Sequence, residues 1–272
     1  MEFMIERARG RDLPEIRDIY AYARSFMSDN GNPTQWVGGY PTDEEIMNDI
    51  ELSQLYVARP RSGSRNIACV FAFFVGLDPS YLSIEDGAWL NDAEYGVIHR
   101  VATAQWAKGR GAAAYCLEQC FGWYGNLRID THADNIPMQH LIEKSGFTRC
   151  GIIHTVSDGT PRIAYQREAD LILASNSPRR RELMKKLGIP FFVDPSKGDE
   201  SLPEGMDVSQ AAEYLSGIKA SEVHERYGHR PVTVIGSDTV VIMDGRIYGK
   251  PQDEADAERM LRELSGRTHE VR

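Results

Sequence analysis

The chain has 272 residues, of which 42% are apolar and 26% are charged, and its formal net charge at pH 7 is −9. This composition suits one or two globular domains with hydrophobic cores and excludes an intrinsically disordered chain. Neither half of the chain carries the excess of Lys and Arg that general nucleic-acid binding requires, so we expect none.

The longest apolar stretch runs from Ile67 to Leu77 and is too short to span a membrane, so it predicts a buried strand. The first residues lack the apolar core of a signal peptide. We therefore expect a cytoplasmic protein without membrane association. Cys116 and Cys120 lie four residues apart in a helical pattern, which favours two buried thiols over a metal pair.

The first part of the chain alternates strand and helix patterns around one polar loop at 31–41 that is rich in Gly and Pro. We expect a mixed α/β fold. A new strand, loop and helix unit starts after residue 167, which predicts one domain over 1–167 and another over 168–272. Strands are predicted at 2–7, 54–59, 66–76, 94–101, 127–131, 147–155 and 162–166, and helices at 8–27, 42–53, 111–123 and 135–145.

A glycine-containing turn precedes one of the predicted helices. It reads Lys108-Gly109-Arg110-Gly111-Ala112-Ala113. Glycines at a helix entrance let backbone N–H groups approach an anion, and the helix dipole favours a diphosphate at that position. The competing interpretation is a simple turn whose glycines serve only a positive φ.

This passage resembles the acetyl-coenzyme A turn of the GCN5-related N-acetyltransferases (GNAT), whose motif is Gln/Arg-x-x-Gly-x-Gly/Ala. Here it reads Lys108-x-x-Gly111-x-Ala113, so its first position departs from the family pattern. The later segment THADNIPMQHLIEKSGFTRCGI is also similar to that family. The resemblance covers about residues 4–167. It implies a central sheet flanked by helices, acetyl-CoA as cofactor, and N-acetyl transfer to a small-molecule or peptide amine.

The same resemblance suggests residues for the chemistry. Asn135 matches a position that commonly contacts the cofactor, and the strand backbone from Val101 to Thr103 should hold the thioester carbonyl. The tyrosine that often serves as general acid is replaced by Ile142.

Two residues of the acetyltransferase-like part allow two interpretations each. His99, in the strand before the turn, is either the general base or a histidine bonded within a packed interior. Trp36, which shares its polar loop with Asn32 and Gln35, either covers the acceptor site or caps the core.

The stretch LILASNSPRRRELMKKLG, from Leu171 to Gly188, predicts a strand followed by a helix with Pro178 at its first position. Three arginines in the first turn of this helix oppose the partial positive charge of its N-terminus. They therefore predict a bound anion. Further along the chain lie polar residues that together suit a triphosphate with a divalent metal, Mg²⁺ or Mn²⁺. The carboxylates of Glu200 and Asp238 would share the metal, while Arg179, Arg180, Lys219 and Lys250 would neutralise phosphate oxygens.

The segment resembles the Maf family of nucleoside triphosphate pyrophosphatases. The resemblance makes Asp238 the proton acceptor, places Ser177 among the residues around the phosphates and metal, and associates Arg179 and Thr239 with dTTP and UTP as substrates. Water would attack the α-phosphorus and release a nucleoside monophosphate and pyrophosphate. The family's domain continues well beyond the segment that matches Leu264 to Val271, so we expect an incomplete α/β Maf-like domain here, with about half of the family's domain absent. A strand starting at Glu270 would then have an open edge.

The leading hypothesis is a bifunctional fusion of an N-acetyltransferase with a Maf-like pyrophosphatase that is inactive if the missing half is required. One alternative is a non-catalytic nucleotide-binding or partner-binding module over 168–272. Another is a dimerisation element completed by a second copy, which gives a homodimer.

Overall fold

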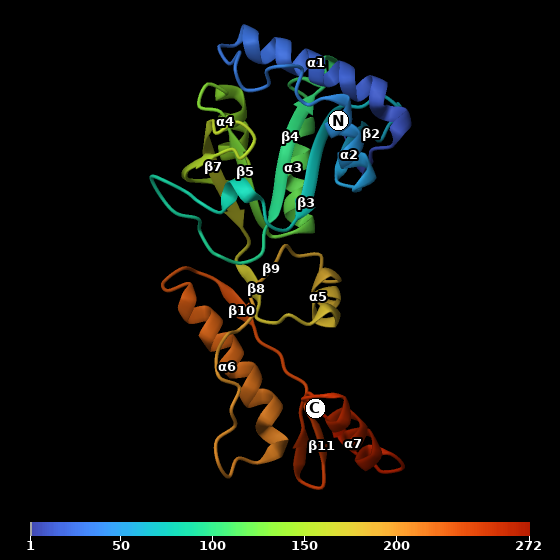
Figure 1. The fold of residues 1–272 in the computed structure, drawn as a ribbon, viewed down its shortest axis with the longest axis vertical. Helices are drawn as coiled ribbons and strands as arrows, with labels where there is room; N and C mark the ends of the chain where they lie inside the picture. Colours follow the sequence, from blue (N-terminus) through green and yellow to red (C-terminus); the bar gives the residue numbers. More distant parts are fainter. Residues whose placement is uncertain (1) are drawn as a thin grey trace. The chain divides into compact units, whose positions relative to one another are not determined.

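The computed structural model describes residues 2–272 (Figure 1). The chain forms two compact units: the first holds residues up to Ala169 together with Gly188–Phe192, and the second holds Asp170–Leu187 and Val193–Arg272. Among residues 2–272, no helix has both the length and the apolar character needed to cross a membrane. Each unit is described separately below.

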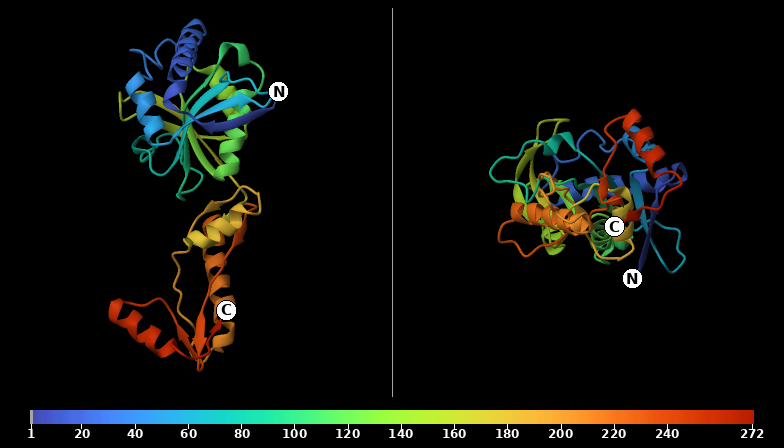
Figure 2. Two further views of the ribbon diagram at one scale, coloured as in Figure 1. Left: turned by 90° about the vertical axis from the view of Figure 1, so that its right-hand side faces the viewer. Right: turned by 90° about the horizontal axis from the view of Figure 1, so that it is seen from below.

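The first unit is built on one seven-stranded sheet with helices on both of its sides (Figure 2). The strand order is β1-β2-β3-β4-β5-β7-β6. Its strands are β1 (Phe3–Arg7), β2 (Leu55–Pro60), β3 (Cys69–Val75), β4 (Gly96–Thr103), β5 (Asn126–Thr131), β6 (Thr148–His154) and β7 (Pro161–Glu168), and its helices are α1 (Leu13–Asp29), α2 (Asp43–Glu51), α3 (Ala112–Trp123) and α4 (Ile136–Lys144).

Strands β4 and β5 are parallel neighbours that pair over only part of their length. Their pairing runs from Gly96 to Ile98, while β4 itself continues to Thr103. The register between β3 and β4 shifts near Arg100, whose φ of 53° is in the left-handed region. Such a bulge bends a strand and increases its local twist. The edge of β4 that faces β5 is therefore open beyond Ile98.

The apolar stretch from Ile67 to Leu77 is interior only in its first part, because Val75 and Leu77 are 43% and 75% exposed. Ile67 to Ala72 are at most 1% exposed, and β3 begins within this run at Cys69. All four cysteines are buried free thiols, which confirms the prediction for Cys116 and Cys120. The strands that carry the candidate site therefore rest on a closely packed core.

The second unit contains two small sheets of three strands each, ordered β10-β8-β9 and β12-β11-β13. The predicted helix after Leu171 is present as α5, and Gly188 follows it with a φ of 67°. Its elements are β8 (Leu171–Leu173), α5 (Pro178–Lys185), β9 (Phe192–Val193), α6 (Ala211–Arg226), β10 (Thr233–Ile235), β11 (Val241–Met243), β12 (Arg246–Tyr248), α7 (Glu254–Leu264) and β13 (Glu270–Val271).

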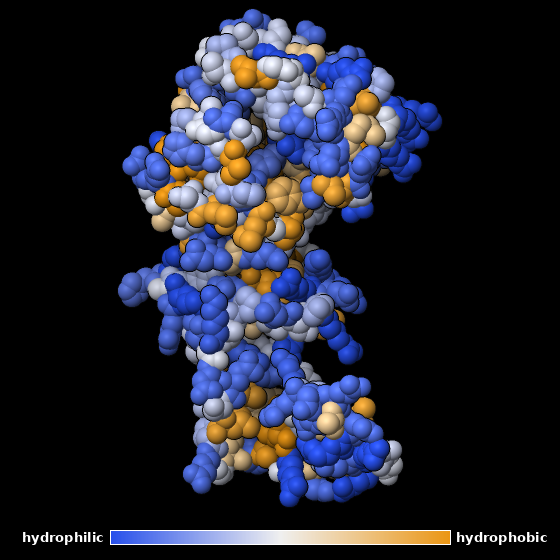
Figure 3. Space-filling view, in the orientation of Figure 1, coloured by the Kyte–Doolittle hydropathy of each residue, from blue (hydrophilic) through white to orange (hydrophobic). Residues whose placement is uncertain are grey.

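The core of the second unit is smaller than that of the first. Ala211 and Leu215 of α6 pack with Val240 and Ile242. Within residues 2–272, strand β13 pairs only with β11 and lies at the edge of its sheet, which confirms the predicted open edge. Figure 3 shows apolar side chains on the surface of both units, and in the second these include exposed leucines of α5 and α7.

Candidate functional site

A cavity of about 750 Å³ lies in the first unit, where β4 and β5 separate. Its walls come from α1, the loop at 35–40, the open end of β4, the end of β5, the start of α4 and the loop at 155–158. The predicted residues Trp36, His99, Val101, Thr103, Lys108 and Asn135 all line it. The fold therefore brings these six positions to one site.

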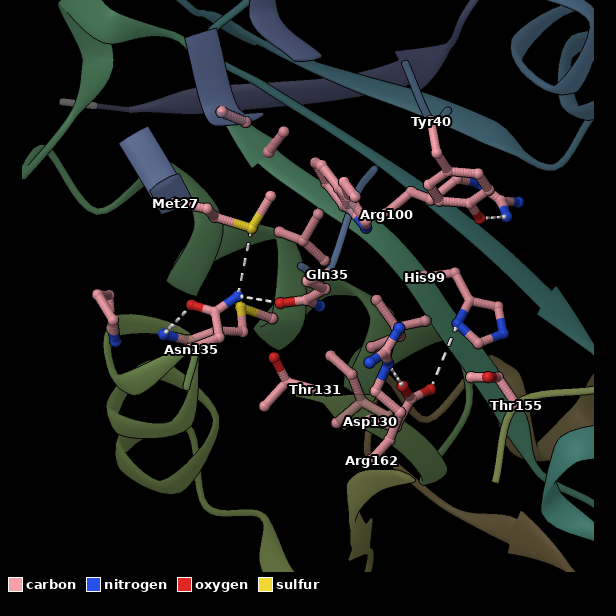
Figure 4. Close-up of a pocket in the computed structure, with 18 of the residues that line it drawn as sticks. Met27, Gln35, Tyr40, His99, Arg100, Asp130, Thr131, Asn135, Thr155 and Arg162 are labelled. Atoms are coloured by element: carbon pink, nitrogen blue, oxygen red, sulfur yellow. Dashed lines mark hydrogen bonds and ion pairs between the residues drawn. The ribbon is translucent and has the colours of Figure 1, made fainter. Parts of the chain in front are cut away.

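His99 lies between two carboxylates at one end of this cavity (Figure 4). Its Nε2 is 2.7 Å from Oδ2 of Asp78, and its Nδ1 is 3.7 Å from Oδ1 of Asp130. The Tyr81 hydroxyl donates to the same Asp130 oxygen at 2.7 Å. The His99 side chain is 23% exposed, so it is neither fully packed nor free in solvent. His99 therefore has features of both interpretations: it faces a cavity, as a general base must, and it is hydrogen-bonded in a largely buried position.

Two groups beside His99 have shifted pKa values. Burial alone would raise the pKa of Asp78, but the hydrogen bond with His99 and a backbone donor at Ser80 lower it below its ordinary 3.8. Burial and the neighbouring Asp130 raise the pKa of Tyr81 well above its ordinary value. Asp78 is therefore charged at neutral pH and Tyr81 is protonated.

The bulge in β4 is fixed by contacts of Arg100. Its guanidinium is 2.6 Å from Oδ2 of Asp49 and donates to the Tyr40 hydroxyl at 3.0 Å. The Tyr20 hydroxyl donates to the Arg100 carbonyl at 3.1 Å. Helices α1 and α2 thus hold the strand in the conformation that opens its edge.

Trp36 and Asn135 lie in the wall of the cavity with other loop residues. The Trp36 ring packs against Tyr20 with 5.6 Å between ring centroids, so it both covers the cavity and contacts a core residue. The Asn135 amide donates to Gln35 at 2.8 Å, and its carbonyl accepts from the Met138 N–H as the cap of α4.

The turn at 108–113 has the features of an anion site. Gly109 and Gly111 have φ values of 73° and 80°, and a Cβ at either would meet open space. The N–H groups of Ala112 and Ala113 make no backbone hydrogen bond among residues 2–272. Lys108 lies 3.4 Å above the Phe26 ring centroid. Unpaired donors below open space fit the diphosphate of a coenzyme.

In the second unit, Lys219 joins two of the predicted carboxylates. Its Nζ is 2.6 Å from Oδ2 of Asp238 and 3.1 Å from Oε2 of Glu200. The residue is 8% exposed. Mg²⁺ in phosphate sites takes one or two carboxylates together with substrate oxygens, so this pair fits such an ion. Among residues 2–272, no group of three or more His, Cys, Asp and Glu side chains forms a metal centre by itself.

Arg180 has structural partners that the sequence analysis did not foresee. Its guanidinium donates to the Ser237 carbonyl at 2.6 Å, to Ser175 Oγ at 3.1 Å and to Thr239 Oγ1 at 3.1 Å, and lies 3.9 Å from Asp238. One of the three arginines thus fixes the loop that carries Asp238. These contacts therefore explain the presence of Arg180 in the first turn of α5 without a bound anion.

The remaining predicted residues of this unit lie apart from the group formed by Lys219, Asp238 and Glu200. Ser177 precedes α5 as its N-terminal cap, without a side-chain bond to the helix, and Arg179 is exposed. Lys250 is exposed and lines a separate hollow beside Tyr248 and Arg259. In the part of the chain that is described, Ser177, Arg179 and Lys250 form no side-chain hydrogen bond or ion pair with Asp238.

Sequence reasoning missed three residues at the cavity: Asp78, Asp130 and Arg162. Asp78 follows β3 in a loop, Asp130 is near the end of β5, and Arg162 is the second residue of β7. The alternation of β5 gave one usable signal, because an acid within an apolar strand pattern marks a polar interior position.

Comparison with known proteins finds a family and relatives that are similar to the second part of the chain. Residues 170–272 match the family model of Maf-like protein. The dTTP/UTP pyrophosphatase of Moorella thermoacetica is 48% identical over 101 residues, which are 37% of this chain and 51% of that protein. That of Thermococcus gammatolerans is 49% identical over 104 residues, or 37% of this chain and 52% of that protein. The chain spans about half the length of these curated relatives.

The first unit is similar to a solved acetyltransferase of the GNAT family from Streptococcus agalactiae. The TM-score is 0.56 and the sequence identity is 29%, over 61% of this chain and 95% of that chain. The protein therefore joins a domain with the fold of a GNAT acetyltransferase to a segment, residues 170–272, that matches the model of the Maf-like family.

Proposed function

We propose that the first unit is an acetyl-CoA-dependent N-acetyltransferase. The observation that carries this proposal is the open edge of β4, which lines the cavity and leads into the glycine turn, whose first residue, Lys108, also lines the cavity. One feature would hold a thioester and the other its diphosphate. The similarity to a GNAT acetyltransferase supports the same conclusion.

The residues have distinct parts in this proposal. The N–H groups of Gly111, Ala112 and Ala113 bind the diphosphate at the start of α3. The backbone of Val101 to Thr103 donates to the thioester carbonyl and stabilises the oxyanion that develops there. Acetyl-CoA supplies the activated acetyl group, which an amine attacks.

His99 takes the proton of the attacking amine in this proposal. Its hydrogen bond with Asp78 fixes the ring and leaves Nδ1 toward the cavity side that Asp130 shares. Ile142 in α4 has a hydrocarbon side chain, so it supplies no proton to the leaving thiolate. The buried Tyr81 hydroxyl is committed to Asp130.

The test is release of free CoA from acetyl-CoA by the full chain in the presence of amines. We expect His99→Gln to lower kcat by about 100-fold, the usual size of general base catalysis, with acetyl-CoA binding unchanged. His140→Gln, at an exposed position on α4, is the matched control and should retain full activity. Equal activity of both variants would exclude His99 as the base.

We propose that the second unit binds nucleoside triphosphates and hydrolyses dTTP or UTP to the monophosphate and pyrophosphate. The similarity to dTTP/UTP pyrophosphatases supports this substrate class, and the contacts of Lys219 with Asp238 and Glu200 support the site. Asp238 would accept the proton of the attacking water, with Mg²⁺ held by Asp238 and Glu200. Ser177, Arg179, Arg180, Lys219 and Lys250 would contact phosphates, and Thr239 would contribute to the choice of nucleotide.

The test is pyrophosphate release from dTTP and UTP with Mg²⁺ by the purified chain. Asp238→Asn should abolish it, and Asp244→Asn, at an exposed turn, should not. Nucleotide binding without turnover would instead identify a binding module. A dimer that becomes monomeric when 168–272 are deleted would support the dimerisation role.

A further inference from the structure

The acceptor end of the cavity contains a buried arginine that the proposed chemistry does not use. Arg162, on β7, lines the cavity and is 7% exposed. Its NH1 has no hydrogen-bond partner among residues 2–272. Its Nε is 3.9 Å from Oδ2 of Asp130, which is beyond hydrogen-bonding distance. A buried cation with so few partners is unfavourable unless an anion joins it.

The carboxylates around Arg162 already have other partners. Asp130 accepts the Tyr81 hydroxyl at 2.7 Å, and Asp78 is bonded to His99 at 2.7 Å. Asp158, in the cavity loop, accepts from the Thr160 N–H at 3.0 Å and the Thr160 hydroxyl at 2.7 Å. The guanidinium of Arg162 therefore keeps unused donors. A planar carboxylate matches such donors better than any other small anion in proteins.

Negatively charged side chains lie close to both Arg162 and His99. His99 and Arg162 approach the two different oxygens of the single Asp130 carboxylate (Figure 4). Asp78 adds a second carboxylate on the far side of the His99 ring. This acidic surrounding attracts a protonated amine to the position where its proton would be taken.

We propose that the acceptor is a free amino acid, a small amine with a carboxylate a few atoms away. Arg162 binds the carboxylate, and the amine lies at His99 and Asp130. The proposal rests on the acetyltransferase function proposed above and names its substrate class. Because both protein groups reach one carboxylate, a ligand that spans them is short. A protein lysine or a polyamine lacks the anion and leaves the NH1 group of Arg162 without a hydrogen-bond partner.

The experiment compares amino acids with their own α-amides. The full chain is incubated with acetyl-CoA and each of the common amino acids or its amide, and free CoA is measured. We expect a kcat/KM for at least one acid that exceeds that of its amide by about 100-fold or more, because the site rejects an analogue that leaves its polar group unpaired. Arg162→Met should reduce that preference to less than about threefold, mainly through KM. Arg149→Met, at an exposed position on β6, is the matched control and should keep the preference.

Thermal unfolding with the same compounds tests the Arg162 site without acetyl-CoA. We expect the preferred acid, and not its amide, to stabilise the wild type, and neither to stabilise Arg162→Met. Circular dichroism shows whether this variant folds, and Arg162→Lys, which keeps the cation, should retain part of the preference.

Three results would overturn the inference: equal use of acids and amides, a preference that survives in Arg162→Met, or reaction only with peptide lysines or spermidine. The last result would leave the acetyltransferase proposal intact. If acetyl-CoA neither binds nor reacts, the acetyltransferase proposal fails. The thermal unfolding experiment then tests the Arg162 site by itself. Equal stabilisation by an amino acid and its amide, or no stabilisation by either, would overturn the proposal of a carboxylate site.

Discussion

The ammonium of Lys219 lies 2.6 Å from Oδ2 of Asp238, and the side chains are only 11% and 14% exposed. The pair connects the middle of α6 with the loop that follows β10. Glu200 completes the group from a third segment, at 3.1 Å from the same nitrogen. The contact thus fixes the relative positions of three parts of the second unit.

Lys219→Met should destabilise the second unit and make it sensitive to Mg²⁺. Two carboxylates are left without their cation, and breaking a partly buried pair of this kind costs about 3 kcal/mol. A divalent ion that binds the two carboxylates should recover part of that loss. Thermal unfolding with and without Mg²⁺ measures both effects. Lys186→Met, at an exposed position, is the control. A variant as stable as the wild type, or one that Mg²⁺ does not stabilise, would contradict the assignment of this pair to the metal.

Asp78→Asn should lower stability at neutral pH and have less effect in acid. The pKa of Asp78 is below 3.8 in the folded chain, so its charged form contributes stability above that pH. The contribution is lost as the pH falls from about 3.8 through the lower folded pKa. Urea unfolding of variant and wild type at pH 7 and pH 3 gives the difference at each pH. Asp18→Asn, an exposed site on α1, should show none, and a difference that grows in acid would disprove the stated role of Asp78.

Asp49→Asn should destabilise the first unit by about 3 kcal/mol, because it leaves the half-buried Arg100 guanidinium without a counter-charge. Burial raises the pKa of Asp49, so the carboxylate depends on Arg100 to stay charged. Acetyl-CoA binding should weaken as well, since Arg100 fixes the bulge of β4. Asp43→Asn removes the exposed pair with Arg17 and should cost much less stability than Asp49→Asn, because solvent screens exposed ion pairs. Equal losses in the two variants, measured by urea unfolding, would refute this view of Arg100.

Gly236→Ala should disrupt the second unit while leaving acetyl-CoA binding intact. A Cβ at Gly236 would lie 2.0 Å from the Ser216 carbonyl oxygen and 3.0 Å from Ala220, so α6 must move away from the loop of Asp238. Gly217→Ala, on the same helix, meets open space and should stabilise by about 0.5–1 kcal/mol. Thermal unfolding distinguishes the two substitutions. Similar unfolding midpoints for the two variants would show that the close approach of Gly236 to α6 does not contribute to the stability of the second unit.

The sequence predicted the order of elements well because local patterns determine it. The helix predicted at 111–123 is observed at Ala112–Trp123, since Gly111 marks its start. Contacts between distant segments carry no such pattern. His99 meets Asp78 only because a loop after β3 folds back, and Arg180 reaches Ser237 across 57 residues. The buried Arg162 was also missed, since a charged residue at a strand end normally predicts exposure.

The most direct measurement is a calorimetric titration of the full chain with acetyl-CoA, comparing the wild type with Gly111→Trp. Gly111→Ala separates the strain of a side chain at a φ of 80° from obstruction of the diphosphate, and Gly122→Ala controls for changes elsewhere on α3. We expect binding by the wild type, Gly111→Ala and Gly122→Ala, and none by a folded Gly111→Trp, because its ring fills the open space above the turn. Absence of binding by the wild type, or unchanged binding by Gly111→Trp, would contradict the proposal that this cavity holds acetyl-CoA.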